Sequence, residues 1–238
     1  MAIKDLLKQI KRDDDLIMAI DQYYEFHMEQ SRDDSGAFHP SAAGDCHMKI
    51  AYAYLGYDRP KMDALIMRKI DNGTWMHKRY EHTFIQMSAL MNNFYLVDLE
   101  IPIEVVVRDS MTIKGHADAI IELNAKKLLI EMKSIRSELF YKLGNEPHPE
   151  YVAQWMIYSD CLSVYEGRIV YENKNDQTLR QYKMFWDADK VRESYDKLWD
   201  IYSYVSQDKL PPRPKGVGIE CTRYSGCQWY NECWGKIE

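Results

Sequence analysis

Two carboxylates and a lysine lie close together near the middle of the chain. Asp118 belongs to the apolar-rich run 112–123. Glu131 and Lys133 belong to a second such run, 128–133. Side chains alternate between the two faces of a strand, so Glu131 and Lys133, two positions apart, are expected to point the same way. The spacing therefore predicts an ionisable group on each of two neighbouring strands, aimed at one place.

A turn at 124–126 would join the two runs into a β-hairpin. The apolar residues around Asp118 and Glu131 indicate that this hairpin lies in the centre of the fold. Burying unpaired charges is unfavourable, so their position requires a compensating partner. A divalent cation that binds both carboxylates would be such a partner. The pattern thus predicts a metal site.

The composition excludes several classes of protein. The chain has 238 residues, of which 46% are hydrophobic and 13% aromatic, enough for one large domain with a packed core. Its net charge of −6 argues against a general polyanion-binding surface, although a single cleft can still be basic. No apolar run approaches the roughly 20 residues that span a bilayer. We therefore expect a cytoplasmic protein that has no membrane partner.

The order of the expected elements favours an α/β fold with a small mixed β-sheet flanked by helices. Helices are expected in the first 92 residues, with an interruption near 71–73. Strands are expected at 95–108, in the hairpin, at 163–171 and at 181–186, and further helices at 147–162 and 188–205. One integrated domain would comprise an N-terminal helical region, a core, and a linker with a cysteine-rich tail, at 1–93, 94–206 and 207–238.

Residues outside the hairpin extend its pattern. Gln154 and Tyr158 are four positions apart in an expected helix and so share one of its faces. Gly73 and His77 form a G-x-x-x-H segment upstream. Together with the hairpin residues, in this order, they resemble the PD-(D/E)xK nuclease superfamily in its RecB-like branch, over about residues 38–234.

This resemblance implies a restriction-endonuclease-like core and a set of site residues. It implies that the catalytic residues are Asp118, Glu131, Lys133, Gln154 and Tyr158. It also implies that Mg²⁺ or Mn²⁺ is bound by His77, Asp118, Glu131 and the carbonyl of Met132. The imidazole ligand would favour Mn²⁺. In this family Lys133 would orient or deprotonate the attacking water and stabilise charge on the phosphate, while Gln154 and Tyr158 would hold Lys133, a water or the substrate strand.

The cysteines resemble those of an iron–sulfur subset of this branch. Five cysteines are present, and three of them lie near the C-terminus with the spacing C-x5-C-x5-C. An odd number in a cytosolic protein argues against a disulfide framework. The subset, which includes CRISPR-associated RecB-like exonucleases and AddB-type nucleases, implies a 4Fe–4S cluster on Cys46, Cys221, Cys227 and Cys233. The first C-terminal pair is more widely spaced than in the subset, so Zn²⁺ on the same thiolates stays open.

The function expected first is a metal-dependent DNA exonuclease that acts on single-stranded or unwound ends. Recombination, phage replication and CRISPR adaptation are the contexts in which such relatives act. Because the chain has no G-x-x-x-x-G-K-[ST] motif of a helicase, the partners would be DNA and a separate recombination, helicase or CRISPR adaptation protein. Two alternatives stay open, a non-catalytic DNA-binding or assembly module that retains the nuclease fold, and an RNA-directed nuclease.

Contacts to the nucleic acid are less specific in the sequence. Lys174 is the strongest of several basic candidates, because the segment 171–174 resembles one that follows the Q-x-x-x-Y helix in RecB-like nucleases. Aromatic residues of the N-terminal half could stack on unpaired bases, and core packing explains them equally well; they are Tyr52, Tyr54, Tyr57, Trp75 and Tyr80.

Overall fold

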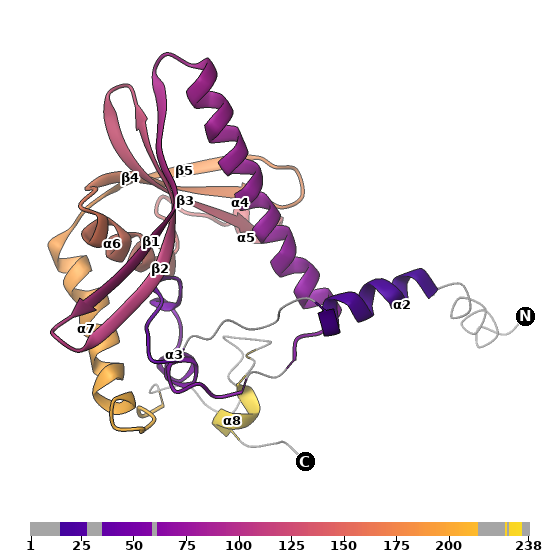
Figure 1. The fold of residues 1–238 in the computed structure, drawn as a ribbon, viewed down its shortest axis with the longest axis vertical. Coiled ribbons are helices and arrows are strands. Elements are labelled where there is room, and N and C mark those ends of the chain that lie inside the picture. Colours follow the sequence, from indigo (N-terminus) through magenta and orange to yellow (C-terminus); the bar gives the residue numbers. More distant parts are fainter. Residues whose placement is uncertain (1–14, 28–34, 59–60, 214–226, 228, 235–238) are drawn as a thin grey trace, which may run out of the picture.

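A five-stranded β-sheet forms the centre of the computed structural model, which describes residues 15–27, 35–58, 61–213, 227 and 229–234 (Figure 1). The strands follow one another across the sheet in chain order. Neighbouring strands are antiparallel except β3 and β4, which are parallel. The strands are β1 (Phe94–Val107), β2 (Met111–Leu123), β3 (Lys126–Ile135), β4 (Glu166–Asn173) and β5 (Leu179–Phe185).

Helices cover both faces of this mixed sheet, which confirms the predicted α/β class. In Figure 1, α4 crosses one face, while α6 and α7 lie on the other. None of the helices in the described part of the chain is long and apolar enough to cross a bilayer. The helical segments are α2 (Asp15–Gln22), η1 (Tyr23–His27), η2 (Pro40–Ala42), α3 (His47–Tyr54), α4 (Ala64–Leu90), α5 (Ser137–Phe140), α6 (Pro149–Leu162), α7 (Ala188–Val205) and α8 (Tyr230–Trp234).

Each face of the sheet has its own apolar core. On one face, Met76 of α4 packs with Ala119, Ile130 and Met132 of the sheet. On the other, residues of α6 and α7 pack with sheet residues that include Ile169. Burial of large apolar side chains is the main favourable term in folding. The two cores therefore fix α4 and α6 on opposite sides of the central strands.

The interruption expected near 71–73 is wrong, because α4 continues without a break through that segment. The Asp63 carboxylate caps the helix by accepting a hydrogen bond from the Ile66 N–H, at 2.8 Å. Farther along, Arg79 and Tyr80 both donate hydrogen bonds to the buried carboxylate of Glu172 in β4. These contacts outweigh the low helix propensity of Gly73, which lies within α4.

The predicted hairpin is present, and its two strands separate next to Asp118 and Glu131. Asn124 and Ala125 form a two-residue turn, both with positive φ, at 52° and 60°. The β2–β3 pairing then runs as far as Ala119 and Ile130 and stops there. Beyond this point β2 pairs with β1 and, at Ile113, with Phe38, while β3 pairs with β4. The sheet therefore divides at Asp118.

The strand predicted at 95–108 is β1, which lies at the edge of the sheet. The β1 register shifts between Leu96 and Asp98. Of the N-terminal region expected to be helical, residues 1–14 and 28–34 lie outside the described residues. Residues 15–27 form α2 and η1.

A tight contact between β3, β4 and α6 holds the second core together. The buried Trp155 indole donates a hydrogen bond to the Leu129 carbonyl, at 3.2 Å. Gly167 pairs with Leu129 directly beneath this ring. A Cβ atom at Gly167 would lie 2.0 Å from the Leu129 oxygen and 2.7 Å from the Trp155 ring. Only a glycine leaves room for the indole.

We predict that Gly167→Ala lowers the free energy of unfolding by about 1–3 kcal/mol, since the new methyl group overpacks the core. Gly73→Ala is the matched control. A Cβ atom at Gly73 meets nothing within 4 Å, and alanine in a helix interior is more favourable than glycine by about 0.5–1 kcal/mol. Urea denaturation followed by circular dichroism measures both. Equal stability of the two variants would contradict the packing argument.

Candidate active site

A cleft of about 470 Å³ opens where β2 and β3 part. The helices α4 and α6 supply its other walls. Its volume lies within the range typical of ligand sites. The cleft brings together six of the side chains singled out from the sequence, which are His77, Asp118, Glu131, Lys133, Gln154 and Tyr158.

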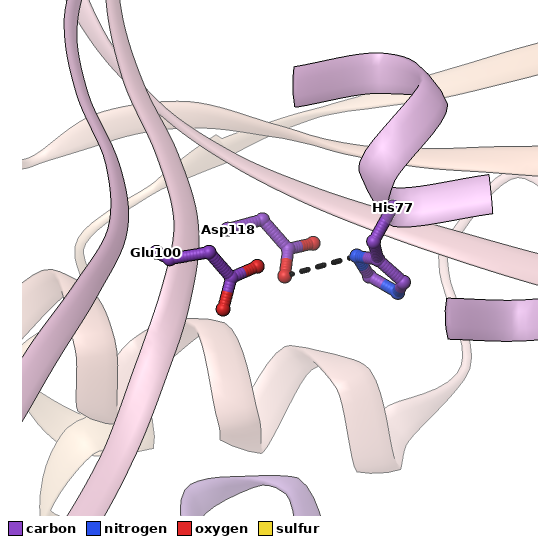
Figure 2. A group of neighbouring side chains, drawn as sticks. All are labelled: His77, Glu100 and Asp118. Atoms are coloured by element: carbon purple, nitrogen blue, oxygen red, sulfur yellow. Dashed lines mark ion pairs between the residues drawn. The ribbon is translucent and has the colours of Figure 1, made fainter. Parts of the chain in front are cut away.

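Asp118 bridges the gap between the separated strands. Its Oδ2 accepts a hydrogen bond from the main-chain N–H of Met132, at 2.6 Å. Its Oδ1 lies 3.3 Å from Nδ1 of His77 on α4 (Figure 2). Burial disfavours the charged imidazolium, but the hydrogen bond and charge of Asp118 outweigh it and raise the pKa of His77. Asp118 therefore joins β2, β3 and α4 at one point.

Glu131, Lys133 and Gln154 form a closed hydrogen-bonded triangle. Lys133 Nζ donates to Glu131 Oε1 at 2.7 Å and to Gln154 Oε1 at 2.8 Å. Gln154 Nε2 in turn donates to Glu131 Oε1, at 2.8 Å. The ammonium group also lies 4.7 Å from the centre of the Tyr151 ring. The amide of Gln154 thus holds both charged side chains in place from α6.

The charges in the cleft are not balanced. Burial, followed by the negative charge of Asp118, raises the pKa of Glu131 to about 7. Burial disfavours the charged form of Lys133, but the charges of Glu131 and Asp118 outweigh it and raise the pKa of Lys133. Lys133 therefore remains an ammonium group, and the carboxylates still repel one another. Positive charge brought into the cleft would relieve this repulsion.

One oxygen of Glu131 has no partner. Oε2 is buried and makes no hydrogen bond with the described residues. An unsatisfied buried carboxylate oxygen is unfavourable by about 1–3 kcal/mol or more. Such an oxygen fits a ligand for a cation, because a metal ion would satisfy it.

Tyr158 lines the cleft from α6, where α6 approaches β2 closely at Gly115. A Cβ atom at Gly115 would lie 3.0 Å from the Tyr158 hydroxyl, so the glycine allows the ring to reach this position. Burial, followed by the charge of Glu131, raises the pKa of Tyr158. Its hydroxyl therefore stays protonated and can donate a hydrogen bond.

Glu100 is a further acidic residue of the cleft, and the sequence did not single it out. It lies opposite Asp118, since its neighbours Leu99 and Ile101 pair with the residues on either side of Asp118. Ligand atoms of His77, Glu100 and Asp118 all lie within 4.8 Å of one another (Figure 2). Burial, followed by the charge of Asp118, raises the pKa of Glu100.

The only signal for Glu100 in the sequence was an acidic residue within an apolar segment, two positions before Pro102. The backbone of Glu100 has a positive φ of 46°, which is uncommon for a residue other than glycine. Only the pairing register of β1 with β2 reveals that this side chain faces Asp118.

Three of the four predicted cysteine ligands gather at a second place, between α3 and α8. Cys46 precedes α3, and Cys227 and Cys233 come from the C-terminal segment; all three pack against a buried cluster of Met48, Tyr52 and Trp229. Burial raises the pKa of the Cys233 thiol, and the nearby Cys46 and Cys227 add to this. Cys221 lies outside the described residues.

Cys161 is separate from this group. Its sulfur lies 3.6 Å from the hydroxyl of Tyr195 in α7, in the core beneath the sheet. The described cysteines are free thiols, with no disulfide among them.

Comparison with known proteins agrees with this fold. No protein-family model and no curated protein sequence matches the chain. Among solved structures, SSO0001 is 19% identical, with a TM-score of 0.57 over 94% of this chain and 98% of that one. The alkaline exonuclease LHK-Exo from Laribacter hongkongensis is 14% identical, with a TM-score of 0.50 over 74% of this chain and 90% of that one.

A second structure of LHK-Exo, in complex with dAMP, is also 14% identical, with a TM-score of 0.52 over 73% of this chain and 89% of that one. At these identities the likeness shows a shared fold. The chain therefore has the α/β fold of an alkaline exonuclease, in agreement with the restriction-endonuclease-like core predicted from its sequence.

Proposed function

We propose that the chain is a metal-dependent nuclease that hydrolyses phosphodiester bonds of DNA. One observation carries the proposal, the convergence of Asp118, Glu131 and Lys133 in a cleft where a buried carboxylate oxygen lacks a partner. The fold shared with a protein named as an exonuclease supports the same activity.

The donor set of the cleft fits Mg²⁺ or Mn²⁺. We assign as ligands His77, Glu100, Asp118, Glu131 through Oε2, and the carbonyl of Met132. Carboxylate and carbonyl oxygens suit both ions, and the imidazole favours Mn²⁺. When bound, such an ion would lower the pKa of a water and polarise the scissile phosphate.

Lys133 would act on the attacking water and on the phosphate. Its ammonium group is held by Glu131 and Gln154, so its position is set before a substrate arrives. A fixed positive charge stabilises the negative charge that develops on the phosphate during hydrolysis. Tyr158, which stays protonated, would donate a hydrogen bond to the substrate strand.

Action at DNA ends is the more specific part of the proposal. LHK-Exo is named as an exonuclease and was solved with dAMP, a mononucleotide. A nuclease that removes terminal nucleotides releases products of that size. DNA and RNA both contain phosphodiester bonds, so both are substrates in the test below.

We also propose that Cys46, Cys221, Cys227 and Cys233 hold a 4Fe–4S cluster. The packing of three of these thiols against one small buried cluster supports a thiolate site, and four thiolates are the usual ligands of such a cluster. The site would join the N-terminal region to the C-terminal tail, so we expect its role to be structural. It would bind no substrate.

We predict that Lys133→Ala and Asp118→Ala each lower the rate of cleavage at least about 100-fold, because a fixed charge or a metal ligand is lost. Labelled single-stranded and duplex DNA and RNA, incubated with Mn²⁺ or Mg²⁺, measure this. Lys127→Ala, an exposed lysine of the same strand, should retain the wild-type rate. If wild-type protein cuts none of these substrates, the proposed activity is wrong.

We predict that Mn²⁺ binds the folded protein and raises its melting temperature in the absence of nucleic acid. At about 100 times the dissociation constant, the stabilisation would be about 2.7 kcal/mol. Glu100→Gln should reduce this shift. The control is Glu104→Gln on the same strand, since the Glu104 carboxylate instead pairs with Lys114, at 3.0 Å. Equal shifts in both variants would remove Glu100 from the ligand set.

We predict that Cys227→Ser abolishes iron binding and lowers the melting temperature, while Cys161→Ser leaves both close to the wild-type values. Metal analysis of anaerobically purified protein and its absorption near about 400 nm measure the cluster. Stoichiometric zinc without iron would retain the thiolate site and reject the cluster. A metal-free, fully stable wild-type protein would reject both.

A further inference from the structure

Trp75 is a large aromatic side chain that the fold leaves in water. It is 61% exposed, whereas its neighbour Met76 is buried in the core beneath α4. An indole ring loses favourable apolar burial in such a position. Core packing, one of the two explanations open for the aromatic residues of this region, therefore does not apply to Trp75. It does apply to Tyr52 and Tyr54, which pack against other rings.

Trp75 borders the candidate active site through Lys78. Lys78 lines the cleft that contains Asp118 and Lys133. Its ammonium group lies 4.9 Å from the centre of the Trp75 ring, one helical turn away on α4. The cation covers part of the ring, and the high exposure of Trp75 leaves other ring surface open at the rim of the cleft.

Three cations, Lys69, Arg136 and Lys174, lie near one another by the N-terminal half of α4. The Lys174 N–H donates to the Ile135 carbonyl at 2.9 Å, which places Lys174 beside Arg136 at the end of β3. Burial, followed by the positive charges of Lys69 and Arg136, lowers the pKa of Lys174. Among the described residues, none of these three forms an ion pair with a carboxylate. They form an unneutralised basic group.

The positions of Trp75 and Lys78 on α4 suit a nucleic-acid strand. The two residues are three apart in the helix and so lie close together on its surface. A strand whose phosphate contacts Lys78 at the cleft could therefore place a base on the Trp75 ring. A neutral apolar partner for Trp75 would leave the adjacent Lys78 without a counter-charge.

We propose that Trp75 and Lys78 form a platform on which an unpaired base stacks, next to the phosphodiester that enters the cleft. The substrate class is then a nucleic-acid strand with a single-stranded end. An internal base in a duplex is already stacked and paired, so its face is not available to an indole. The inference rests on the proposed function only for the identity of the cleft as the cleavage site.

Affinity measured without hydrolysis tests the proposal. Fluorescence anisotropy of a short labelled oligothymidine is recorded in EDTA with the wild type, Trp75→Ala, Trp75→Phe and Phe185→Ala. Phe185 is the matched control, an aromatic side chain 58% exposed on β5 and away from the cleft. A blunt duplex of the same length serves as the second ligand, and oligouridine tests the sugar.

We expect Trp75→Ala to weaken binding of the single strand by about 5- to 100-fold, the loss of one stacked base. Trp75→Phe should retain most of the affinity, and Phe185→Ala all of it. Affinity for the duplex should be the same in every variant. Because Trp75 is exposed, its replacement should leave the melting temperature unchanged.

The proposal is overturned if Trp75→Ala binds the single strand as tightly as the wild type does, or if it loses affinity for strand and duplex alike. Failure of the proposed activity gives a different result. In that case single-strand binding would still depend on Trp75, while wild-type protein would cut no substrate with Mn²⁺. If Trp75→Ala weakens binding of both oligouridine and oligothymidine, stacking is supported. The ratio of the wild-type affinities for the two strands then shows whether RNA or DNA is preferred.

Discussion

The hydrogen bond from the Met132 N–H to the Asp118 carboxylate is the contact on which the candidate site depends. It forms where the β2–β3 ladder ends, so a side chain replaces the main-chain partner that β2 would otherwise supply. The strands can separate at this point without leaving a buried N–H unsatisfied. Their separation opens the cleft, and the bond keeps Asp118 beside Glu131 while it does so.

The chemistry of the cleft follows from an electrostatic conflict that the protein alone does not resolve. Lys133 neutralises one carboxylate, and His77 partly compensates another, but the exposed carboxylate of Glu100 adds a third in the same place. Structural ion pairs are normally complete, because an unpaired buried charge is costly, yet Oε2 of the buried Glu131 has no partner among the described residues. An incomplete set of this kind is typical of a site that binds a cation, and this is why we interpret it as a metal centre.

Apolar packing next to the charged residues holds the two helices that complete the site. Met76 anchors α4 to one face of the sheet, and the neighbouring His77 then reaches Asp118. Trp155 anchors α6 to the other face, and the neighbouring Gln154 then reaches Glu131. In both helices the polar residue stands directly before or after a buried one. The positions of His77 and Gln154 in the site therefore depend on how the two cores pack.

The sequence by itself determined the features that depend on near neighbours along the chain. The alternation of strand side chains placed Glu131 and Lys133 on one face, and helical spacing placed Gln154 one turn from Tyr158. The α/β class followed from the same periodicities. These patterns repeat within a few residues, so no distant part of the chain is needed to interpret them.

Only the tertiary structure decided the features that depend on strand register and on packing between distant segments. The register of β1 brought Glu100 opposite Asp118, and the second core left Gly167 as the one residue small enough to lie under Trp155. The continuity of α4 through Gly73 and the exposure of its Trp75 were decided in the same way. A strand can pair in several registers with similar local energies, and burial of the whole apolar surface selects among them.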